Sequence, residues 1–103
     1  MKIGETALHT FTIPFELEDP QDIRIKYHQI DGVVVEKTLS DSVEYEAGDG
    51  ITTIRTWLSS EETARFRNGE AAIVLEIDTD GGDVMISDHF FCPVEGFPRE
   101  EER

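Results

Sequence analysis

Residues 22–29 alternate strictly between apolar and polar side chains. The apolar phase holds Ile23, Ile25 and Tyr27, and the other phase holds Arg24, Lys26 and His28. Successive side chains of a β-strand point to opposite faces, so this pattern predicts a strand with one face in a core and the other in solvent. Any fold for this chain must place such a strand where a core covers one side only.

Turn-forming residues interrupt the chain about every 10 to 18 residues, as short antiparallel strands require. These interruptions are Asp19-Pro20, Asp31-Gly32, Gly48-Asp49-Gly50, Asn68-Gly69 and Asp80-Gly81-Gly82. Between them the pattern predicts strands over residues 6–15, 22–29, 33–38, 43–46, 51–58, 71–78 and 84–94. Pro14 cannot donate a backbone hydrogen bond, so we expect the first strand at a sheet edge.

The turn at Asp31-Gly32 predicts a hairpin whose register can be chosen by side-chain phase. A two-residue loop would pair Tyr27 with Glu36, whereas a three-residue loop over 30–32 pairs Tyr27 with Val35. The second register brings the apolar phases of both strands together. We therefore expect the longer loop, with Gly32 at positive φ in a bulge.

One short helix is predicted between residues 59 and 68. Ser59 and Glu62 have the spacing of a reciprocal capping box, in which each side chain bonds the backbone N–H of the other residue. Asn68-Gly69 supplies a stop, so we expect about two turns. The strand that follows, over residues 71–78, turns at 80–83 into the last strand.

About seven strands, with one short helix before the penultimate strand, predict an immunoglobulin-like antiparallel β-sandwich. The helix would lie where the chain crosses between sheets. The Trp and disulfide signature of antibody domains is missing, since Cys92 is the only cysteine. A barrel, or an α+β sheet covered by one helix, is the alternative. We expect a single domain over residues 1–97 and a charged, disordered tail over 98–103.

Charge restricts the partners. The chain has 23 acidic and 9 basic residues and a formal net charge of -14, which opposes binding to nucleic acid and to anionic membrane surfaces. Protein partners, including further copies of the chain, and carbohydrate stay open. The N-terminus lacks an apolar segment, so we expect synthesis in the cytoplasm without a signal peptide.

Two groups of residues are candidates for a metal-binding or catalytic site. Asp78, Asp80 and Asp83 could offer oxygens to Ca²⁺, but Asp and Gly are also what a hairpin turn selects. His89 and Cys92 could join His9 or His28 at a zinc ion or as nucleophile and base, although residues three apart on a strand face opposite sides. We expect Cys92 in the core or at its boundary, and no catalytic residue, metal, cofactor or enzymatic activity.

Aromatic residues are the candidate partner contacts. Phe90 and Phe91 are consecutive on a strand, so one should enter the core and the other should face outward. The outward ring, together with Trp57 and Phe97, could form an exposed patch for a protein or a sugar ring. We name Trp57, Phe91 and Phe97 as the candidates; the alternative is that helix and tail cover them.

Part of the second half resembles a known group of proteins. The run 56–70 (TWLSSEETARFRNGE), the strand 72–78, the Gly-rich turn and Ile86-Ser87-Asp88 are similar to small structural proteins of tailed phages and prophages. These resemble the N-terminal immunoglobulin-like domain of phage baseplate upper proteins. Their pattern is a strand, a Leu-Ser-x-Glu-Glu-Thr helix with a Phe, a Gly, a hairpin and a Ser-Asp in the last strand.

The resemblance implies a structural, non-catalytic domain of a phage tail or baseplate. Such a domain would join a ring or trimer through sheet edges and exposed apolar side chains. Its partners would be copies of itself or other tail proteins, and its final location would be the virion. A carbohydrate-binding or surface-adhesion module is the alternative, and it requires Trp57 on a concave surface with polar neighbours.

Overall fold

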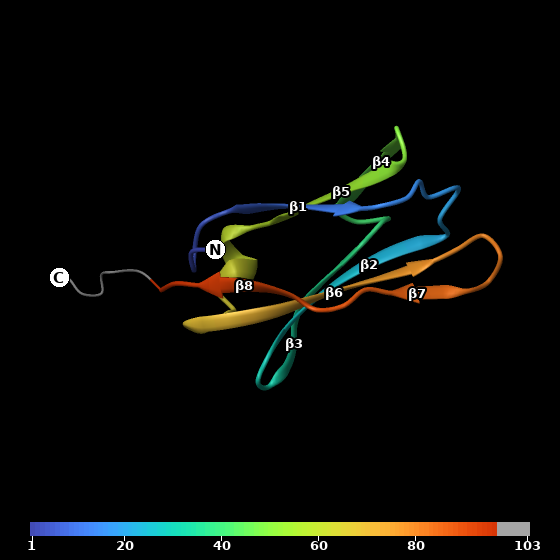
Figure 1. Cartoon of the computed structure of the whole chain (residues 1–103). Coiled ribbons are helices and arrows are strands. Elements are labelled where there is room, and N and C mark those ends of the chain that lie inside the picture. The colour runs from blue at the N-terminus through green and yellow to red at the C-terminus, as the bar shows by residue number, and fades with distance from the viewer. Residues whose placement is uncertain (97–103) are drawn as a thin grey trace.

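Strand β2 (Asp22–Gln29) occupies the middle of the larger of two antiparallel sheets in the computed structural model, which describes residues 1–96 (Figure 1). It pairs with β3 (Gly32–Thr38) on one side and β6 (Gly69–Asp78) on the other. The far edge of β6 pairs with β7 (Val84–Ile86) and then β8 (Phe90–Val94). Phe97 and the predicted tail lie outside the described residues.

The smaller sheet has the order β1-β5-β4, formed by β1 (Ala7–Ile13), β5 (Ile51–Leu58) and β4 (Val43–Gly48). The predicted edge position of the first strand is confirmed, because β1 pairs only with β5 among the described residues. The strand ends at Ile13, directly before Pro14, which has no N–H to extend the ladder.

The strand order is that of an immunoglobulin-like sandwich. With β1 taken as strand B, the smaller sheet becomes B-E-D and the larger sheet C′-C-F-G, which is the immunoglobulin arrangement without strand A. The short helix α1 (Ser60–Thr63) joins β5 of one sheet to β6 of the other, as predicted. The predicted fold class is therefore confirmed.

The last predicted strand, residues 84–94, is divided into β7 and β8, so eight strands replace the expected seven or so. Ser87 causes the break. Its N–H donates to the Leu75 carbonyl, while its Oγ accepts from the Leu75 N–H at 3.0 Å, so a side chain stands where a backbone carbonyl would continue the ladder. The chain leaves β6 after Ser87 and returns at Phe90.

The β2–β3 hairpin has the predicted pairing of Tyr27 with Val35. Gly32 has φ 115°, so its predicted positive φ is also confirmed. The predicted loop is wrong: Gln29 pairs with Gly32 across a two-residue turn, and the extra residue of the bulge is Val34. Because Val34 is left unpaired, the bulge brings Tyr27 opposite Val35, the same pairing that the longer loop was expected to give.

The capping box of α1 is present, since the Glu62 N–H donates to Ser59 Oγ and the Ser59 N–H donates to Glu62 Oε1. The predicted length is wrong, because the helix has only four residues and ends before Asn68-Gly69. Phe66 explains the early end. The chain turns it into the core, where its ring packs edge-on against Tyr27 at 5.9 Å.

The core lies between the two sheets and has the predicted phases. Ile23, Ile25 and Tyr27 are fully buried on β2, and the inward residues of β6 surround them: Ala71, Ile73, Leu75 and Ile77. The smaller sheet contributes its own inward row, made of Phe11, Val43, Ile54 and Leu58. Each strand therefore buries one side-chain phase against the opposite sheet.

Residues 1–3 lie beside β8 as a short extended segment. Lys2 forms a parallel bridge with Glu95, in which the Ile3 N–H donates to the Glu95 carbonyl and the Glu95 N–H donates to the Met1 carbonyl, both at 2.9 Å. This segment covers the sheet edge only at the β8 end. The described residues place no strand beside β7 on that edge.

Candidate functional site

An apolar cleft opens between the two sheets where β1 and β7 form their neighbouring edges. One wall consists of residues 11–15, from β1 and the turn after it, and the other consists of residues 85–87 with Phe90. Leu75 and Ile77 of β6 form the floor. The cleft has a volume of 320 Å³. Its position corresponds to strand A of the immunoglobulin order, which residues 1–96 do not form.

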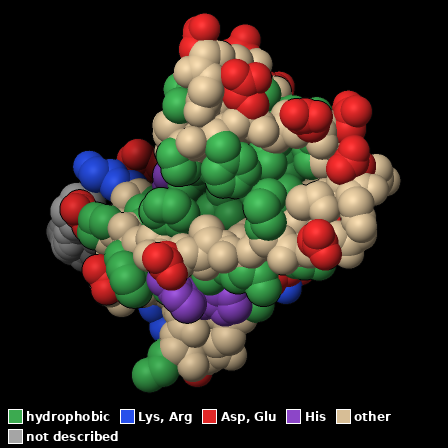
Figure 2. Space-filling model, turned by 45° about the vertical axis from the view of Figure 1, so that its right-hand side comes forward, with side chains coloured by type: hydrophobic (Ala, Val, Ile, Leu, Met, Phe, Trp, Pro, Cys, Tyr) green, Lys and Arg blue, Asp and Glu red, His purple; other side chains and the backbone are tan. Residues whose placement is uncertain are grey.

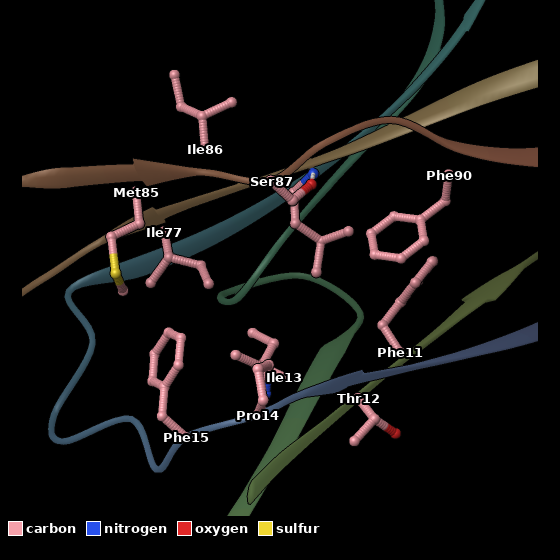
Figure 3. Close-up of a pocket in the computed structure, with 11 residues that line it drawn as sticks. Phe11, Thr12, Ile13, Pro14, Phe15, Ile77, Met85, Ile86, Ser87 and Phe90 are labelled. Carbon is pink, nitrogen blue, oxygen red and sulfur yellow. Dashed lines mark hydrogen bonds between the residues drawn. The ribbon is translucent and has the colours of Figure 1, made fainter.

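The side chains of the cleft face one another across the gap (Figure 3). Phe15 points toward Met85, and Phe11 approaches Phe90 with ring centroids 5.4 Å apart, whereas Ile86 points away. Phe15 is 43% exposed and Phe90 42% exposed, although both rings point toward the interior of the sandwich. Partly uncovered core-facing aromatic rings of this kind are typical of interaction surfaces.

One end of the cleft is acidic. A second hollow of 270 Å³ shares Phe15, Ile77 and Met85 with the first, and Glu16, Glu18 and Asp80 also line it. Neither hollow has a Lys or Arg in its lining. Figure 2 shows the apolar hollow on this face of the molecule with acidic side chains around it. The cleft therefore offers an apolar surface that continues into negative charge.

The cleft lining is mostly apolar. Its polar side chains are Thr12 and Ser87. The Ser87 hydroxyl accepts from the Leu75 N–H and donates to the Asp88 carbonyl, so both of these hydrogen bonds are made within the chain. The lining residues include no Cys, His or Lys that could act as a nucleophile or base.

A separate polar cluster joins the sheets at the β8 end. His9 Nδ1 lies 2.7 Å from Tyr27 Oη, and His9 Nε2 lies 4.0 Å from Cys92 Sγ. Burial, and then the positive charge of the amino terminus, lower the pKa of His9 below its ordinary value, and burial raises the pKa of Tyr27. Cys92 is at the core boundary, as predicted, and His89 is exposed on another face. The four residues considered for zinc therefore do not converge.

Hydrogen bonds within the chain hold the acidic turn over residues 78–83. Arg24 Nη1 and Nη2 donate to Asp78 at 2.7 and 3.0 Å, and this pairing lowers the pKa of Asp78. Thr79 organises the turn: its Oγ1 donates to the Asp83 carbonyl and accepts from the Asp83 N–H. Across residues 1–96, no three His, Cys, Asp or Glu side chains are grouped closely enough to hold a metal ion.

The predicted contact residues are dispersed. Trp57 is 42% exposed on the outer face of the smaller sheet, where it pairs with Leu8, and Phe91 is 64% exposed on the outer face of the larger sheet. These two side chains therefore do not form one patch, because they lie on opposite sides of the sandwich. Phe97 lies outside the described residues. Trp57 lines none of the hollows described here.

Sequence reasoning did not find the cleft. Alternation identifies Phe11 and Ile13 as facing inward, but it does not show that β1 and β7 are neighbouring open edges, which depends on the order of strands in both sheets. The nearest signals were Pro14, which marked an edge, and the FF pair at 90–91. Of that pair, Phe90 faces inward and rims the cleft.

The chain is thus an immunoglobulin-like β-sandwich with an open apolar edge. It matches no protein-family model and no curated protein. Among solved structures, it is similar to the V domain of amphioxus IgVJ-C2, with 11% identity, a TM-score of 0.40, and coverage of 93% of this chain and 96% of that one. The fold class follows from the strand order and does not depend on this likeness. No helix among residues 1–96 has the length and apolarity needed to cross a bilayer.

Proposed function

We propose that this domain is a non-catalytic assembly module that binds another polypeptide through the cleft between β1 and β7. The observation that carries the proposal is the pair of partly exposed rings, Phe15 and Phe90, which face the inside of the sandwich with no strand from residues 1–96 over them. Covering apolar surface gives roughly 25 cal/mol for each Å² removed from water. An uncovered core edge therefore favours association with a second chain.

The resemblance of residues 56–70 to tailed-phage structural proteins supports a phage tail or baseplate as the setting of this binding. In that setting the partner is a second copy of the chain or another tail protein. The net charge of -14 supports a protein partner over nucleic acid or an anionic membrane. Binding of a carbohydrate at Trp57 is the alternative; Trp57 pairs with Leu8 across the strands, and the next pair on the same face is Thr10 with Arg55.

Site-specific photo-cross-linking in cells of the source organism tests the proposal. A photoreactive phenylalanine analogue is placed at Met85, which lines the cleft, and separately at Glu44 on the exposed strand β4. We expect a discrete protein adduct from position 85 alone, and mass spectrometry identifies the protein. Equal adducts from both positions, or none from position 85, would contradict binding at the cleft. An adduct with a protein unrelated to tails would contradict the phage setting only.

Light scattering at several protein concentrations distinguishes self-association from binding to a different chain. If copies associate through the cleft, the mass of the wild-type protein rises with concentration, and Met85→Lys abolishes the rise because it places a charge against apolar surface. Val84→Lys provides the matched control, since Val84 is the preceding residue of β7 and is exposed on the opposite face of the strand. A rise that persists in Met85→Lys contradicts self-association through the cleft.

A further inference from the structure

We propose that the occupant of the cleft is an extended strand of another polypeptide, with alternating apolar side chains that fill the cleft and basic residues at its N-terminal end. This inference rests on the proposed function and specifies the chemistry of the partner. It combines three observations: two free sheet edges, a segment of the chain that already binds in this way, and the acidic end of the cleft.

The two free edges supply the backbone partners. Within residues 1–96, β1 pairs only with β5 and β7 pairs only with β6, so the edges that border the cleft carry backbone groups with no strand partner. An incoming strand can bond to such an edge while every second side chain points into the gap. A helix satisfies its own backbone groups and would leave these edges unpaired.

Residues 1–3 show the mode of binding. This segment runs parallel to the β8 side of the same edge, and its bridge at Lys2–Glu95 has two hydrogen bonds of 2.9 Å. β7 and β8 both run antiparallel to β6, so they share one direction. A strand that continues the line of residues 1–3 along the cleft therefore runs parallel to β7.

Direction fixes which end of the partner meets the acids. Residues 16 and 18 follow the C-terminal end of β1, and Asp80 lies in the turn before β7, so the acidic hollow is at the beginning of β7. A strand parallel to β7 begins at that end. Its N-terminal residues consequently meet Glu16, Glu18 and Asp80, where Lys or Arg would be attracted and acidic residues repelled.

The apolar requirement comes from the remainder of the cleft. Ile13, Ile77 and Met85 face the space that the strand would enter, and Leu75 also lines it. A volume of 320 Å³ has room for a few medium-sized side chains such as Val or Ile, and not for an additional helix. The partner is therefore expected to read as two basic residues followed by apolar residues at alternate positions.

Selection from a library of random dodecamer peptides tests this prediction without knowledge of the natural partner. The folded domain is the target, and Met85→Lys is the counter-target. We expect enriched peptides to alternate in apolarity and to carry Lys or Arg before the apolar run. Synthetic peptides of the enriched sequences should bind wild type at least about tenfold more tightly than Met85→Lys, because a buried charge would face an apolar strand.

Two comparisons check the inference on those synthetic peptides. Removing charge with Glu18→Gln and Asp80→Asn should weaken binding about three- to tenfold, while Glu36→Gln with Glu44→Gln, which removes the same charge elsewhere, should leave it unchanged. A peptide with the basic pair moved to its C-terminal end should bind more weakly.

The outcomes separate the inference from the proposed function. Cleft-dependent peptides with helical periodicity, or with no basic residues at the N-terminal end, would overturn the strand inference and leave cleft binding intact. Equal binding by the peptide with the basic pair at its C-terminal end would overturn the assigned direction. Failure to obtain any peptide that distinguishes wild type from Met85→Lys would overturn the strand inference, and the cross-linking at position 85 would then decide the proposed function by itself.

Discussion

Tyr27 Oη lies 2.7 Å from His9 Nδ1, and this contact joins the two sheets across the core. Tyr27 stands on β2 of the larger sheet and is fully buried, and His9 stands on β1 of the smaller sheet. Antibody domains use a disulfide between sheets, which a chain with one cysteine cannot form. The polar pair ties the sheets together near the end of the sandwich at which residues 1–3 cover the edge.

Removing the tyrosine hydroxyl should destabilise the domain. Tyr27→Phe leaves His9 Nδ1 half-buried without its partner, and the expected loss in free energy of unfolding is about 1–2 kcal/mol. Urea unfolding followed by Trp57 fluorescence measures it. Tyr45→Phe is the control, because Tyr45 is 36% exposed, and its change should stay within about 0.5 kcal/mol. Equal stability of wild type and Tyr27→Phe would show that the hydrogen bond contributes nothing net.

His9 should make the stability depend on pH in mildly acidic solution. Burial lowers its pKa below the ordinary value of 6.5, so between the two values the unfolded chain binds more protons than the folded one. Stability then falls as the pH decreases below 6.5 and stops falling below the folded pKa of His9. The slope of unfolding free energy between pH 5 and 6.5 should be smaller in His9→Gln than in wild type.

The titration of the carboxylates changes the stability in a lower pH range, so it does not interfere with the measurement on His9. Pairing lowers the pKa of Glu76, with the hydrogen bond from Lys26 as the largest cause, and that stabilisation is lost only as the pH falls below the ordinary value of 4.5. Its contribution, like that of Asp78, is therefore the same in wild type and His9→Gln above pH 5. An identical slope in the two proteins would contradict a lowered His9 pKa.

How much could be predicted from sequence depends on the range of the interaction. Alternation over residues 22–29 and the capping pair Ser59 and Glu62 are local, and both predictions hold. The end of α1 and the break at Ser87 depend on tertiary contacts, with Tyr27 in one case and Leu75 in the other, and both predictions failed. The cleft needs the order of both sheets, which no local pattern contains.

Lys37, whose side chain is buried, forms an ion pair with Glu62 that connects β3 to α1. Lys37 Nζ lies 2.7 Å from both carboxylate oxygens, and the lysine side chain is only 6% exposed. Burial would raise the pKa of Glu62, but the hydrogen bonds from Lys37 and Ser59 outweigh it and hold the pKa below its ordinary value. Lys37→Met should cost about 1–3 kcal/mol, because it removes the hydrogen bonds of a buried cation and leaves the partly exposed Glu62 carboxylate with only the Ser59 N–H as a donor.

An ion pair with a more exposed lysine provides the comparison. Lys26 Nζ lies 3.1 Å from Glu76 Oε2 on the outer face of the larger sheet, and its side chain is 27% exposed. Lys26→Met should therefore cost no more than about 1 kcal/mol. Glu62→Gln combined with Lys37→Met should recover part of the loss, since the uncompensated charge is gone. Equal costs for the two lysine variants would contradict the role of burial.

Gly32 should resist substitution because of its backbone conformation. Its φ of 115° lies in a region that residues with a Cβ rarely adopt, and an added Cβ would meet no atom within 4 Å. Any loss of stability in Gly32→Ala therefore comes from the backbone rather than from a clash, and we expect about 1–2 kcal/mol. Gly48→Ala is the matched control. Like Gly32, Gly48 is the terminal residue of a strand and has open space around an added Cβ, but its φ is not positive. Thermal unfolding of the two variants should show a lower midpoint for Gly32→Ala alone, and equal midpoints would show that the β2–β3 turn relaxes to accept the side chain.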